Sequence, residues 1–354
     1  MEFLYSNLPP LKTSNTTFID AFYSLIPKAS RLDIAVGYIT ADSLAELQQT
    51  IDYNPNIETL NLIIGMHRWD KFTKLEYNAA VNLNNYLRSN ERGEVRLVTP
   101  FRFHGKLYSY SNKQGAFAGL IGSNNLSSIV DSHTRTYEVS ILFHESVYAV
   151  QMRDFIEKLS VNASDNIADC EITTFRKYNS LLENHENVEK VSQDKLANCV
   201  SSLTKTRFEI PLVKDGKVPI KSNLNVFFGK GRLVAQKGVV QPRHWYETEI
   251  IVPKSITSIP GYPQEDTPTA IFDVITDDGW KFSCKVSGSS SKNFRSENDL
   301  KILGKWIKGR LEAAGVLEVG CPVTADTFMN YGRDNFCFIK TTTPNLWYVD
   351  FGVK

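Results

Sequence analysis

Two neighbouring stretches organise the chain: Phe103-His104-Gly105-Lys106-Leu107-Tyr108, and shortly after it Leu120-Ile121-Gly122-Ser123-Asn124-Asn125. The first stretch predicts a strand on which His104, Lys106 and Tyr108 project from one face. The second predicts a strand that ends in a turn of small polar residues. Such a turn offers hydroxyl, amide and backbone N–H donors to an anion.

These residue types suit attack on a phosphodiester. His104 supplies an imidazole that can act as a nucleophile or carry a proton, and Lys106 supplies a fixed positive charge beside it. The turn adds Ser123 and Asn125 as further donors. Negative charge must be held while the P–O bond breaks, and these groups can hold it.

The pattern H-x-K followed by G-S-x-N resembles the signature of the phospholipase D superfamily. That resemblance implies an active site that joins two such motifs and cleaves phosphodiesters through a phosphohistidine intermediate without a metal. The superfamily pattern has an Asp five residues after the lysine, and Ser111 holds that place here. An H-x-K triplet also arises by chance, so the hypothesis depends on its pairing with Gly-Ser-Asn-Asn.

An acidic residue follows the turn. The segment Arg135–Phe143 predicts a strand that carries Glu138 among β-forming residues. The resemblance to the nuclease branch of the superfamily implies that a Glu in this place orients the histidine, and Glu138 is the candidate. The alternative is a solvated edge residue or a salt-bridge partner. His133 is a rival that we expect in a loop.

Strand-like and helix-like patterns alternate in the first half of the chain. We expect strands at 31–40, 59–66 and 94–99, and helices at 41–51, 73–88 and 147–160. This alternation predicts a sheet with parallel pairs covered by helices, an α/β/α sandwich over residues 1–172. It is also the fold that the resemblance implies.

The pattern weakens over residues 173–206, which predicts a linker with some helix or an extra helix packed on the first domain. From 207 to 354 short strands and turns prevail. We expect strands at 224–228, 247–252, 269–274, 280–286, 336–340 and 346–351, a helix at 298–314, and a second helix from Thr324 or Asp326. The result is a compact, mostly β module.

Two polar, basic segments of this module are candidate DNA-binding arms. They supply Lys230, Arg232, Arg243, His244, Trp245, Ser289, Lys292, Asn293 and Arg295. Such side chains suit base edges and phosphates. The alternative is a pair of solvated loops. From Arg207 onward the chain has 20 Lys and Arg against 16 Asp and Glu, a balance that is compatible with a nucleic-acid surface.

In the order of its elements and the placement of its two arms, this module is similar to the pseudobarrel DNA-binding domain of plant transcription factors and some restriction endonucleases. A phospholipase-D-like domain followed by a pseudobarrel resembles the metal-independent type II restriction endonucleases of the BfiI and NgoAVII kind. The resemblance implies cleavage of double-stranded DNA at or near a specific sequence, with no cofactor and no metal. It also implies a cognate DNA methyltransferase, and it leaves open whether a separate ATPase partner takes part.

This interpretation assigns a role to each candidate residue. His104 attacks phosphorus, Lys106 and Asn125 hold the non-bridging oxygens, Ser123 assists and Glu138 orients the imidazole. The chain has no second H-x-K. If the superfamily's two-motif rule holds, two subunits must meet through their N-terminal domains to form a homodimer.

Composition sets the remaining expectations. A length of 354 residues predicts two domains. The five cysteines are scattered without a C-x-x-C pair, which argues against disulfides and a zinc site. No stretch approaches the roughly 20 apolar residues of a membrane span, and the N-terminus lacks a secretory pattern. We expect a cytoplasmic protein without a membrane partner.

Two other function classes fit parts of the pattern. A lipid phosphodiesterase could use the same catalytic cluster, but the sequence shows no amphipathic membrane-binding stretch and gives the C-terminal module no task. A non-catalytic, sequence-specific DNA-binding protein would keep the arms and use the first domain for dimerisation alone. Cleavage of plasmid DNA in excess EDTA separates the three.

Overall fold

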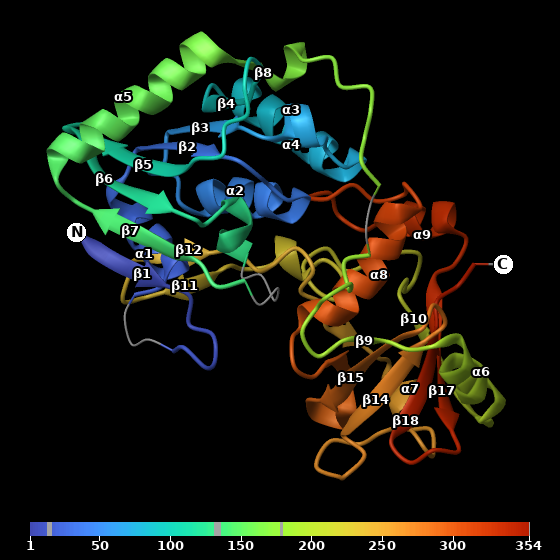
Figure 1. Ribbon diagram of the computed structural model, residues 1–354. Helices are drawn as coiled ribbons and strands as arrows, with labels where there is room; N and C mark the ends of the chain where they lie inside the picture. The colour runs from blue at the N-terminus through green and yellow to red at the C-terminus, as the bar shows by residue number, and fades with distance from the viewer. Residues whose placement is uncertain (13–15, 131–135, 178–179, 354) are drawn as a thin grey trace. The chain divides into compact units, whose positions relative to one another are not determined.

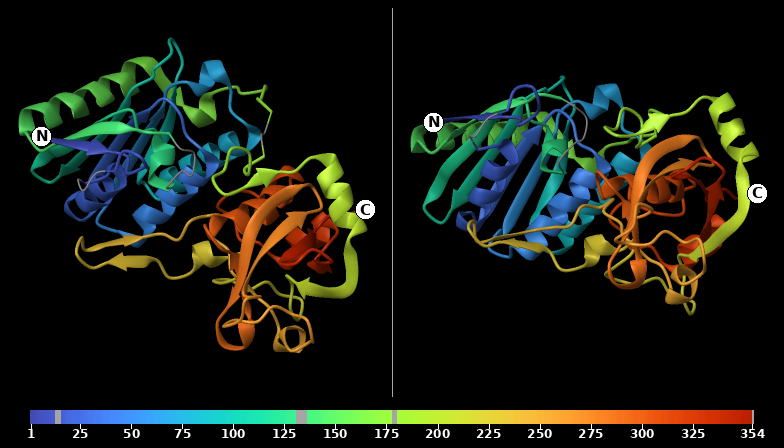
Figure 2. Two further views of the ribbon diagram at one scale, coloured as in Figure 1. Left: turned by 60° about the horizontal axis from the view of Figure 1, so that its bottom comes forward. Right: turned by 90° about the horizontal axis from the view of Figure 1, so that it is seen from below.

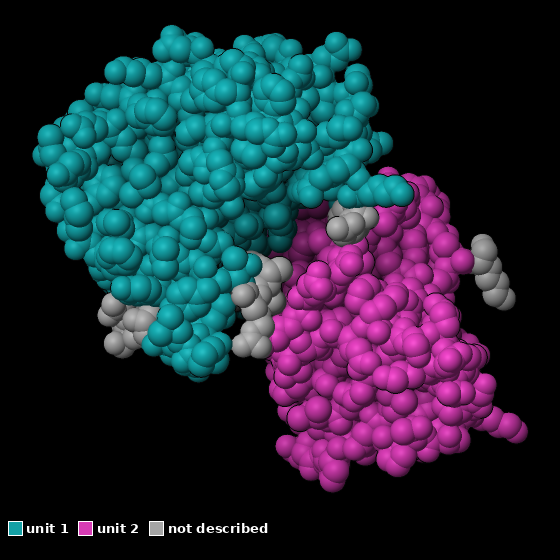
Figure 3. Space-filling view, in the orientation of Figure 1, with its two compact units in different colours: residues 1–178, 231–242 teal, residues 179–230, 243–354 magenta. Residues whose placement is uncertain are grey.

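The computed structural model describes residues 1–12, 16–130, 136–177 and 180–353. The chain divides into two compact units (Figures 1 and 3). Unit 1 comprises Met1–Tyr178 together with Gly231–Pro242, and unit 2 comprises Asn179–Lys230 together with Arg243–Lys354. The short segment Gly231–Pro242, which interrupts unit 2 in the sequence, therefore belongs to unit 1.

Unit 1 is built on an eight-stranded sheet in the order β1-β7-β6-β5-β2-β3-β4-β8. Its strands are β1 (Glu2–Tyr5), β2 (Arg31–Val36), β3 (Thr59–Ile64), β4 (Gly93–Val98), β5 (Lys106–Asn112), β6 (Gly115–Gly122), β7 (Val139–Phe143) and β8 (Ser164–Asn166). Strands β2, β3 and β4 pair in parallel, and the other neighbouring strands pair antiparallel. The mixed sheet with parallel pairs is the one that the sequence predicts.

Helices cover both faces of this sheet, which confirms the predicted α/β/α sandwich (Figure 1). One face carries α5 (Ser146–Ala163), whose apolar side chains pack on the strands beneath it. The other carries α1 (Phe18–Leu25), α2 (Ala41–Tyr53) and α4 (Lys74–Ser89). The remaining short pieces are η1 (Ile26–Lys28), α3 (His67–Asp70), η2 (Leu126–Val130) and η3 (Ile167–Asp169).

Local sequence explains where these helices begin. Thr17, Thr40 and Thr73 each stand at the N-cap of α1, α2 and α4, and each forms a capping box with the third residue of its helix. A capping box satisfies two N–H groups that the first turn would leave unpaired. Helix α4 therefore starts at Lys74, one residue after the predicted start.

The segment Gly231–Pro242 is a hairpin that packs on helices of unit 1 (Figure 2). Its strands are β11 (Arg232–Val234) and β12 (Val239–Gln241). The Asn54 amide donates to the carbonyl of Val240 at 2.9 Å and accepts from its N–H at 3.2 Å. Lys237 Nζ lies 2.6 Å from Asp20 Oδ1. The sequence predicts a polar arm or a solvated loop here and misses this packing.

Unit 2 contains an eight-stranded sheet, in which seven strands follow the order β10-β17-β18-β14-β15-β16-β13 and β9 pairs with β15. Its strands are β9 (Glu189–Lys190), β10 (Leu203–Pro211), β13 (Ile250–Ile251), β14 (Ile271–Thr276), β15 (Trp280–Ser287), β16 (Asn293–Ser296), β17 (Asn335–Thr341) and β18 (Leu346–Asp350). Phe338 stacks on Trp347 at 4.1 Å between ring centroids, within an aromatic core. The sheet-rich second domain is as predicted.

The helices of unit 2 are α6 (Gln193–Ser201), α7 (Lys254–Thr257), α8 (Lys301–Ala313) and α9 (Ala325–Tyr331), with 3₁₀ turns η4 (Val226–Phe228) and η5 (Ser289–Ser291). Thr324 caps α9, as the sequence indicates. The predicted strand at 224–228 is wrong: Val226–Phe228 forms η4. Asn225 stabilises that turn through hydrogen bonds from its side chain to the carbonyls of Pro219 and Val323.

Part of the predicted linker is folded. Helix α6 places Cys199 in a small core with Val191 and Ile275, and β9 pairs with β15. These residues belong to unit 2. The predicted domain limits at 172/173 and 206/207 stay predictions. Among the described residues, no helix is long and apolar enough to cross a membrane.

Lys308 on α8 gives unit 2 a pH-dependent stability. Its side chain is fully buried, and its ammonium group donates to the carbonyl of Trp245 and lies 3.9 Å from that ring's centroid. Burial lowers the pKa of Lys308 to about 7, while the charge of Glu312 opposes the shift. The folded chain therefore binds fewer protons than the unfolded chain between about pH 7 and the ordinary lysine range.

We predict that the free energy of unfolding of the wild type, relative to Lys308→Met, rises with pH above about 7. The difference should rise by up to about 1.4 kcal/mol per pH unit, because the unfolded state holds the extra proton in this window. Chemical denaturation of both proteins between pH 6.5 and 9.5 measures it. Two parallel stability curves would contradict the burial argument.

Candidate active site

The candidate catalytic residues come from one edge of the sheet of unit 1. Lys106 at the start of β5 pairs with Val36 at the end of β2. Strand β6 reaches the same edge where Ile121 pairs with Leu107, and Gly122 pairs with Ser140 near the start of β7. The residues just beyond these strand ends therefore meet at one place, which the register of the sheet determines.

His104 lies just before β5, so the predicted strand, which begins at Phe103, is three residues too long at its start. Backbone hydrogen bonds hold the loop against the ends of β2 and β3: Phe103 N–H donates to Gly65 O at 3.2 Å, and Gly37 N–H donates to Gly105 O at 3.0 Å. A Cβ on Gly65 would come within 2.0 Å of the Phe103 carbonyl oxygen. Glycine permits this close approach.

The His104 ring packs against the edge of Tyr38, with centroids 5.6 Å apart and ring planes at 81°. Its side chain is exposed, and among the described residues neither ring nitrogen has a hydrogen-bond partner. A Cβ on Gly37 would lie 2.9 Å from His104 Cδ2. The imidazole is therefore held by packing and keeps its nitrogens available for chemistry.

Lys106 is buried beside this loop and 7% exposed. Its Nζ donates to the backbone carbonyl of His104 at 2.9 Å. Burial lowers the pKa of Lys106, and the negative charge of Glu138 opposes that shift. An ammonium group has three donors, so two N–H groups remain for an anion beside His104.

The polar residues of the Gly-Ser-Asn-Asn turn make different hydrogen bonds. Asn125 Oδ1 accepts from the backbone N–H of Tyr38 at 3.1 Å, which leaves its amide N–H₂ to face another acceptor. The Ser123 hydroxyl donates to Val139 O at 3.2 Å and accepts from Val139 N–H at 3.0 Å. Ser123 thus closes the end of the β6–β7 pair, and its predicted assisting role stays a prediction.

Asn124 is a structural residue that the sequence reading did not assign. It is buried, its Oδ1 accepts from Ser140 Oγ at 2.6 Å, and its Nδ2 donates to Ser128 Oγ at 3.1 Å. Its carbonyl accepts from Tyr108 OH at 2.9 Å. These bonds fix the turn that presents Asn125. The motif places both asparagines in the turn, and only the fold tells them apart.

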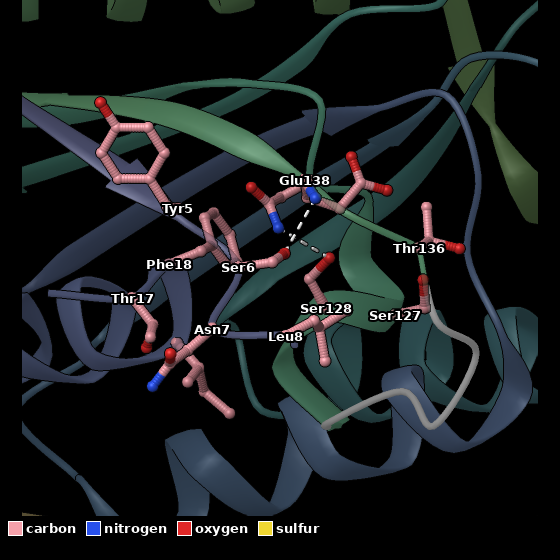
Figure 4. A pocket seen from close by; sticks show the side chains of 12 residues that line it. Tyr5, Ser6, Asn7, Leu8, Thr17, Phe18, Ser127, Ser128, Thr136 and Glu138 are labelled. Carbon is pink, nitrogen blue, oxygen red and sulfur yellow. Dashed lines mark hydrogen bonds between the residues drawn. The ribbon is translucent and has the colours of Figure 1, made fainter. Parts of the chain in front are cut away.

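Glu138 immediately precedes β7 instead of lying within a strand. Its backbone N–H donates to Ser6 Oγ at 2.8 Å, and it borders a pocket of about 300 Å³ lined mainly by small polar side chains (Figure 4). Among the described residues, no hydrogen bond joins its carboxylate to His104, so the orienting role stays a prediction. The rival His133 lies outside the described residues.

Ser111 occupies the far end of β5, opposite Arg31. It is buried there. Lys106 lies at the other end of the same strand, so Ser111 is far along β5 from the end that carries His104.

Tyr38 and its neighbours are the residues that the sequence reading missed. The Tyr38 hydroxyl donates to Asp70 Oδ2 at 2.5 Å, and Arg102 Nη1 donates to Asp70 Oδ1 at 2.7 Å. The His67 ring also packs against Tyr38, with 5.6 Å between the ring centroids. Burial lowers the pKa of His67 to about 4, so this second histidine is neutral at pH 7.

The predicted DNA-binding residues fall into three groups. Lys230, Arg232, Ser289 and Lys292 are exposed, and Arg243, His244, Asn293 and Arg295 are partly buried. Arg243 already makes two hydrogen bonds to the buried carboxylate of Glu247. Arg295 Nε lies 3.9 Å from Glu249 Oε1. The third group is Trp245 alone.

The proposal that Trp245 contacts DNA needs correction. Its side chain is fully buried, and its Nε1–H donates to Glu312 Oε1 at 2.8 Å. A ring in this position stabilises the core of unit 2 and presents no surface to a ligand. The polar residues around Trp245 in the sequence predicted an exposed segment, and therefore its burial was not expected.

The described residues contain no group of three or more His, Cys, Asp or Glu side chains arranged to hold a metal ion. The cysteines among them form no disulfide.

Two family models match the chain in sequence order. The model of the NgoFVII restriction endonuclease N-terminal PLD domain matches residues 16–190. The model of the NgoFVII C-terminal B3-like DNA-binding domain matches residues 198–342. The comparison with curated proteins finds no match.

Solved structures resemble about half of the chain. Nuc, a phospholipase D family member from Salmonella typhimurium, is 14% identical with a TM-score of 0.33, and the match covers 47% of this chain and 95% of Nuc. NucT from Helicobacter pylori is 15% identical with a TM-score of 0.30, covering 47% and 99%. The phosphatidylserine synthase of Haemophilus influenzae is 15% identical with a TM-score of 0.33, covering 48% and 41%.

We predict that Gly37→Ala impairs catalysis more than folding. The new methyl group would displace the His104 ring, and a small displacement of a reacting group costs on the order of a hundredfold in rate. Single-turnover kinetics and thermal unfolding on the same preparation measure both effects. Wild-type turnover in a folded Gly37→Ala protein would contradict the proposed placement of His104.

Proposed function

We propose that this chain, which belongs to the NgoFVII restriction endonuclease family and is a phosphodiesterase with a DNA-binding domain, cleaves DNA at or near a specific sequence by metal-independent phosphohistidine chemistry. The observation that carries this proposal is the meeting of His104, Lys106 and Asn125 at one edge of the sheet. Exposed imidazole nitrogens, a buried ammonium group and a fixed amide donor match the needs of phosphoryl transfer.

The reaction proceeds in two displacements. A ring nitrogen of His104 attacks the scissile phosphorus, an N–P bond forms, and the P–O bond to the leaving strand breaks. The partner subunit's His104 gives its proton to the departing oxygen. Water then attacks the phosphohistidine, the partner subunit's His104 takes a proton from that water, and the N–P bond breaks. Lys106 and Asn125 hold the non-bridging oxygens in both steps.

A homodimer supplies the second histidine, and α5 offers a surface for it. Val147, Tyr148, Phe155 and Val161 on α5 are between 46% and 73% exposed. The Phe155 ring lies 6.3 Å from that of Phe103, the residue before His104. Because Phe155 lies beside the nucleophile's loop, a second copy docked on these side chains would bring its own loop close.

Unit 2 then serves as the reader of sequence. Lys292 and Ser289 are exposed on and beside η5, where they could reach a DNA groove. A chromosome that carries the same site needs protection, which implies a cognate DNA methyltransferase. Whether a separate ATPase is needed is tested by comparing DNA cleavage by the pure protein with and without that partner.

The direct test is digestion of plasmid DNA by the pure protein in excess EDTA. Discrete fragments are expected, because the proposed nucleophile is an imidazole and not a metal-bound water. Sequencing the fragment ends then gives the site and the cleavage positions. An absence of cutting that Mg²⁺ restores would contradict metal independence, and turnover of phospholipid without DNA cleavage would contradict the substrate.

We predict that His104→Ala abolishes cleavage while specific DNA binding survives. The nucleophile lies in unit 1, and the proposed readers of sequence lie in unit 2. Cleavage assays and fluorescence anisotropy with a labelled cognate duplex measure the two properties separately. Equal losses of cleavage and binding would count against this division of labour.

Arg295→Ala tests the second candidate DNA-binding arm. If Arg295 makes a bidentate base contact, its loss should cost about 1 to 3 kcal/mol of discrimination against a mismatched site. The same test for Arg243→Ala must include a stability measurement, because that side chain holds Glu247. Discrimination that does not change in Arg295→Ala would remove it from the reading residues.

We also predict that the double variant Tyr148→Asp, Phe155→Asp is a monomer that no longer cleaves DNA. Two carboxylates in an apolar interface lose their hydration without gaining partners. Sedimentation velocity measures the mass, and Ile220→Asp, at a position 72% exposed in unit 2, is the matched control. A monomeric variant with wild-type cleavage would exclude the shared active site.

A further inference from the structure

A cationic and aromatic patch lies beside the candidate nucleophile, and the catalytic roles above leave it unassigned. It consists of Arg102, two residues before His104, and Trp69 on α3. The Arg102 side chain is 56% exposed and Trp69 is 45% exposed. The Arg102 guanidinium carbon lies 5.9 Å from the centroid of the Trp69 ring.

One hydrogen bond holds the Arg102 side chain in place and leaves most of its N–H donors available. Its Nη1 donates to Asp70 Oδ1 at 2.7 Å, and among the described residues its other N–H groups have no protein acceptor. A guanidinium has five N–H donors in a planar fork, so most of them face solvent. The guanidinium group can therefore bind a phosphate and keep its hydrogen bond to Asp70.

The same carboxylate connects the patch to the nucleophile. Asp70 Oδ2 accepts from Tyr38 OH at 2.5 Å, and the hydrogen bond from Tyr38 lowers the pKa of Asp70. The ring of Tyr38 packs edge-on against His104 at 5.6 Å. Arg102, Asp70 and Tyr38 thus form a continuous chain of contacts that ends on the imidazole.

We propose that Arg102 and Trp69 form a subsite for the DNA backbone next to the scissile phosphate. Arg102 binds a neighbouring phosphate, and the indole of Trp69 packs against the adjoining sugar or against a base exposed at the cleavage point. Asp70 and Tyr38 are positioning residues that hold the fork and the imidazole in one frame. This proposal rests on the proposed function and deepens it.

The chemistry favours a nucleic-acid strand. Guanidinium groups bind phosphate oxygens through paired hydrogen bonds, and exposed aromatic rings stack on bases whatever their sequence. The carboxylate of Asp70 would repel a phosphate by itself, but it already accepts hydrogen bonds from Arg102 Nη1 and from Tyr38 OH. The rival occupant is the partner subunit, and the test separates the two.

The experiment measures DNA binding by the full-length protein in the inactive His104→Ala background. Arg102→Gln is compared with Arg88→Gln, which removes an exposed arginine near the C-terminal end of α4. Each phosphate contact contributes about 0.9 to the slope of log affinity against log salt. We expect Arg102→Gln to reduce that slope by about 1, and Arg88→Gln to leave it unchanged.

Trp69 is tested by a pair of variants in the active enzyme. Trp69→Ala should raise KM for a short duplex about tenfold, because base or sugar stacking on an aromatic ring contributes about 1 to 3 kcal/mol, while kcat stays near the wild-type value. Trp69→Phe should restore most of the loss. A structural role alone would lower thermal stability without this split between KM and kcat.

The outcomes are distinct. If the wild type cleaves DNA but both variants show wild-type salt slopes and KM values, the subsite is wrong and the proposed function stands. If the variants change the dimer dissociation constant instead, the patch is a subunit contact and the DNA subsite is again wrong. A wild-type protein that cleaves no DNA overturns the proposed function itself, whatever the binding data for Arg102→Gln.

Discussion

The antiparallel pairing of β5 with β2 is the constraint on which the site depends. It sets Lys106 opposite Val36 and places the loop that precedes β5 over the ends of two parallel strands. A shift of one residue would turn Lys106 to the other face of the sheet. The glycines at 37 and 65 let this loop approach so closely that the position of His104 follows from backbone packing.

Much of this arrangement could be predicted from sequence because it rests on local patterns. Alternating apolar segments indicate the sheet, and the predicted starts of α2 and α4 lie within one residue of the observed ones. The H-x-K and Gly-Ser-Asn-Asn motifs bring His104, Lys106 and Asn125 to the same edge once the strands are ordered. What those motifs cannot distinguish is Asn124 from Asn125, because both are small amides in one turn and only burial separates them.

Long-range contacts explain what the sequence reading missed. Tyr38 falls within the strand predicted at 31–40, but β2 ends at Val36. The contacts of Tyr38 with His104, Asp70 and Asn125 depend on segments far along the chain. The hairpin Gly231–Pro242 reads as a polar arm, yet the Asn54 amide pairs with its backbone in unit 1. Trp245 reads as part of the same arm, yet it fills the core of unit 2.

The central claim is that cleavage passes through a covalent bond between His104 and phosphorus. The stereochemistry at phosphorus tests it most directly, with a duplex that carries a phosphorothioate of one configuration at the cleaved position and ¹⁸O-labelled water. Two successive in-line displacements predict net retention of configuration in the product. Net inversion would mean that water attacks the phosphodiester directly, and would contradict the account.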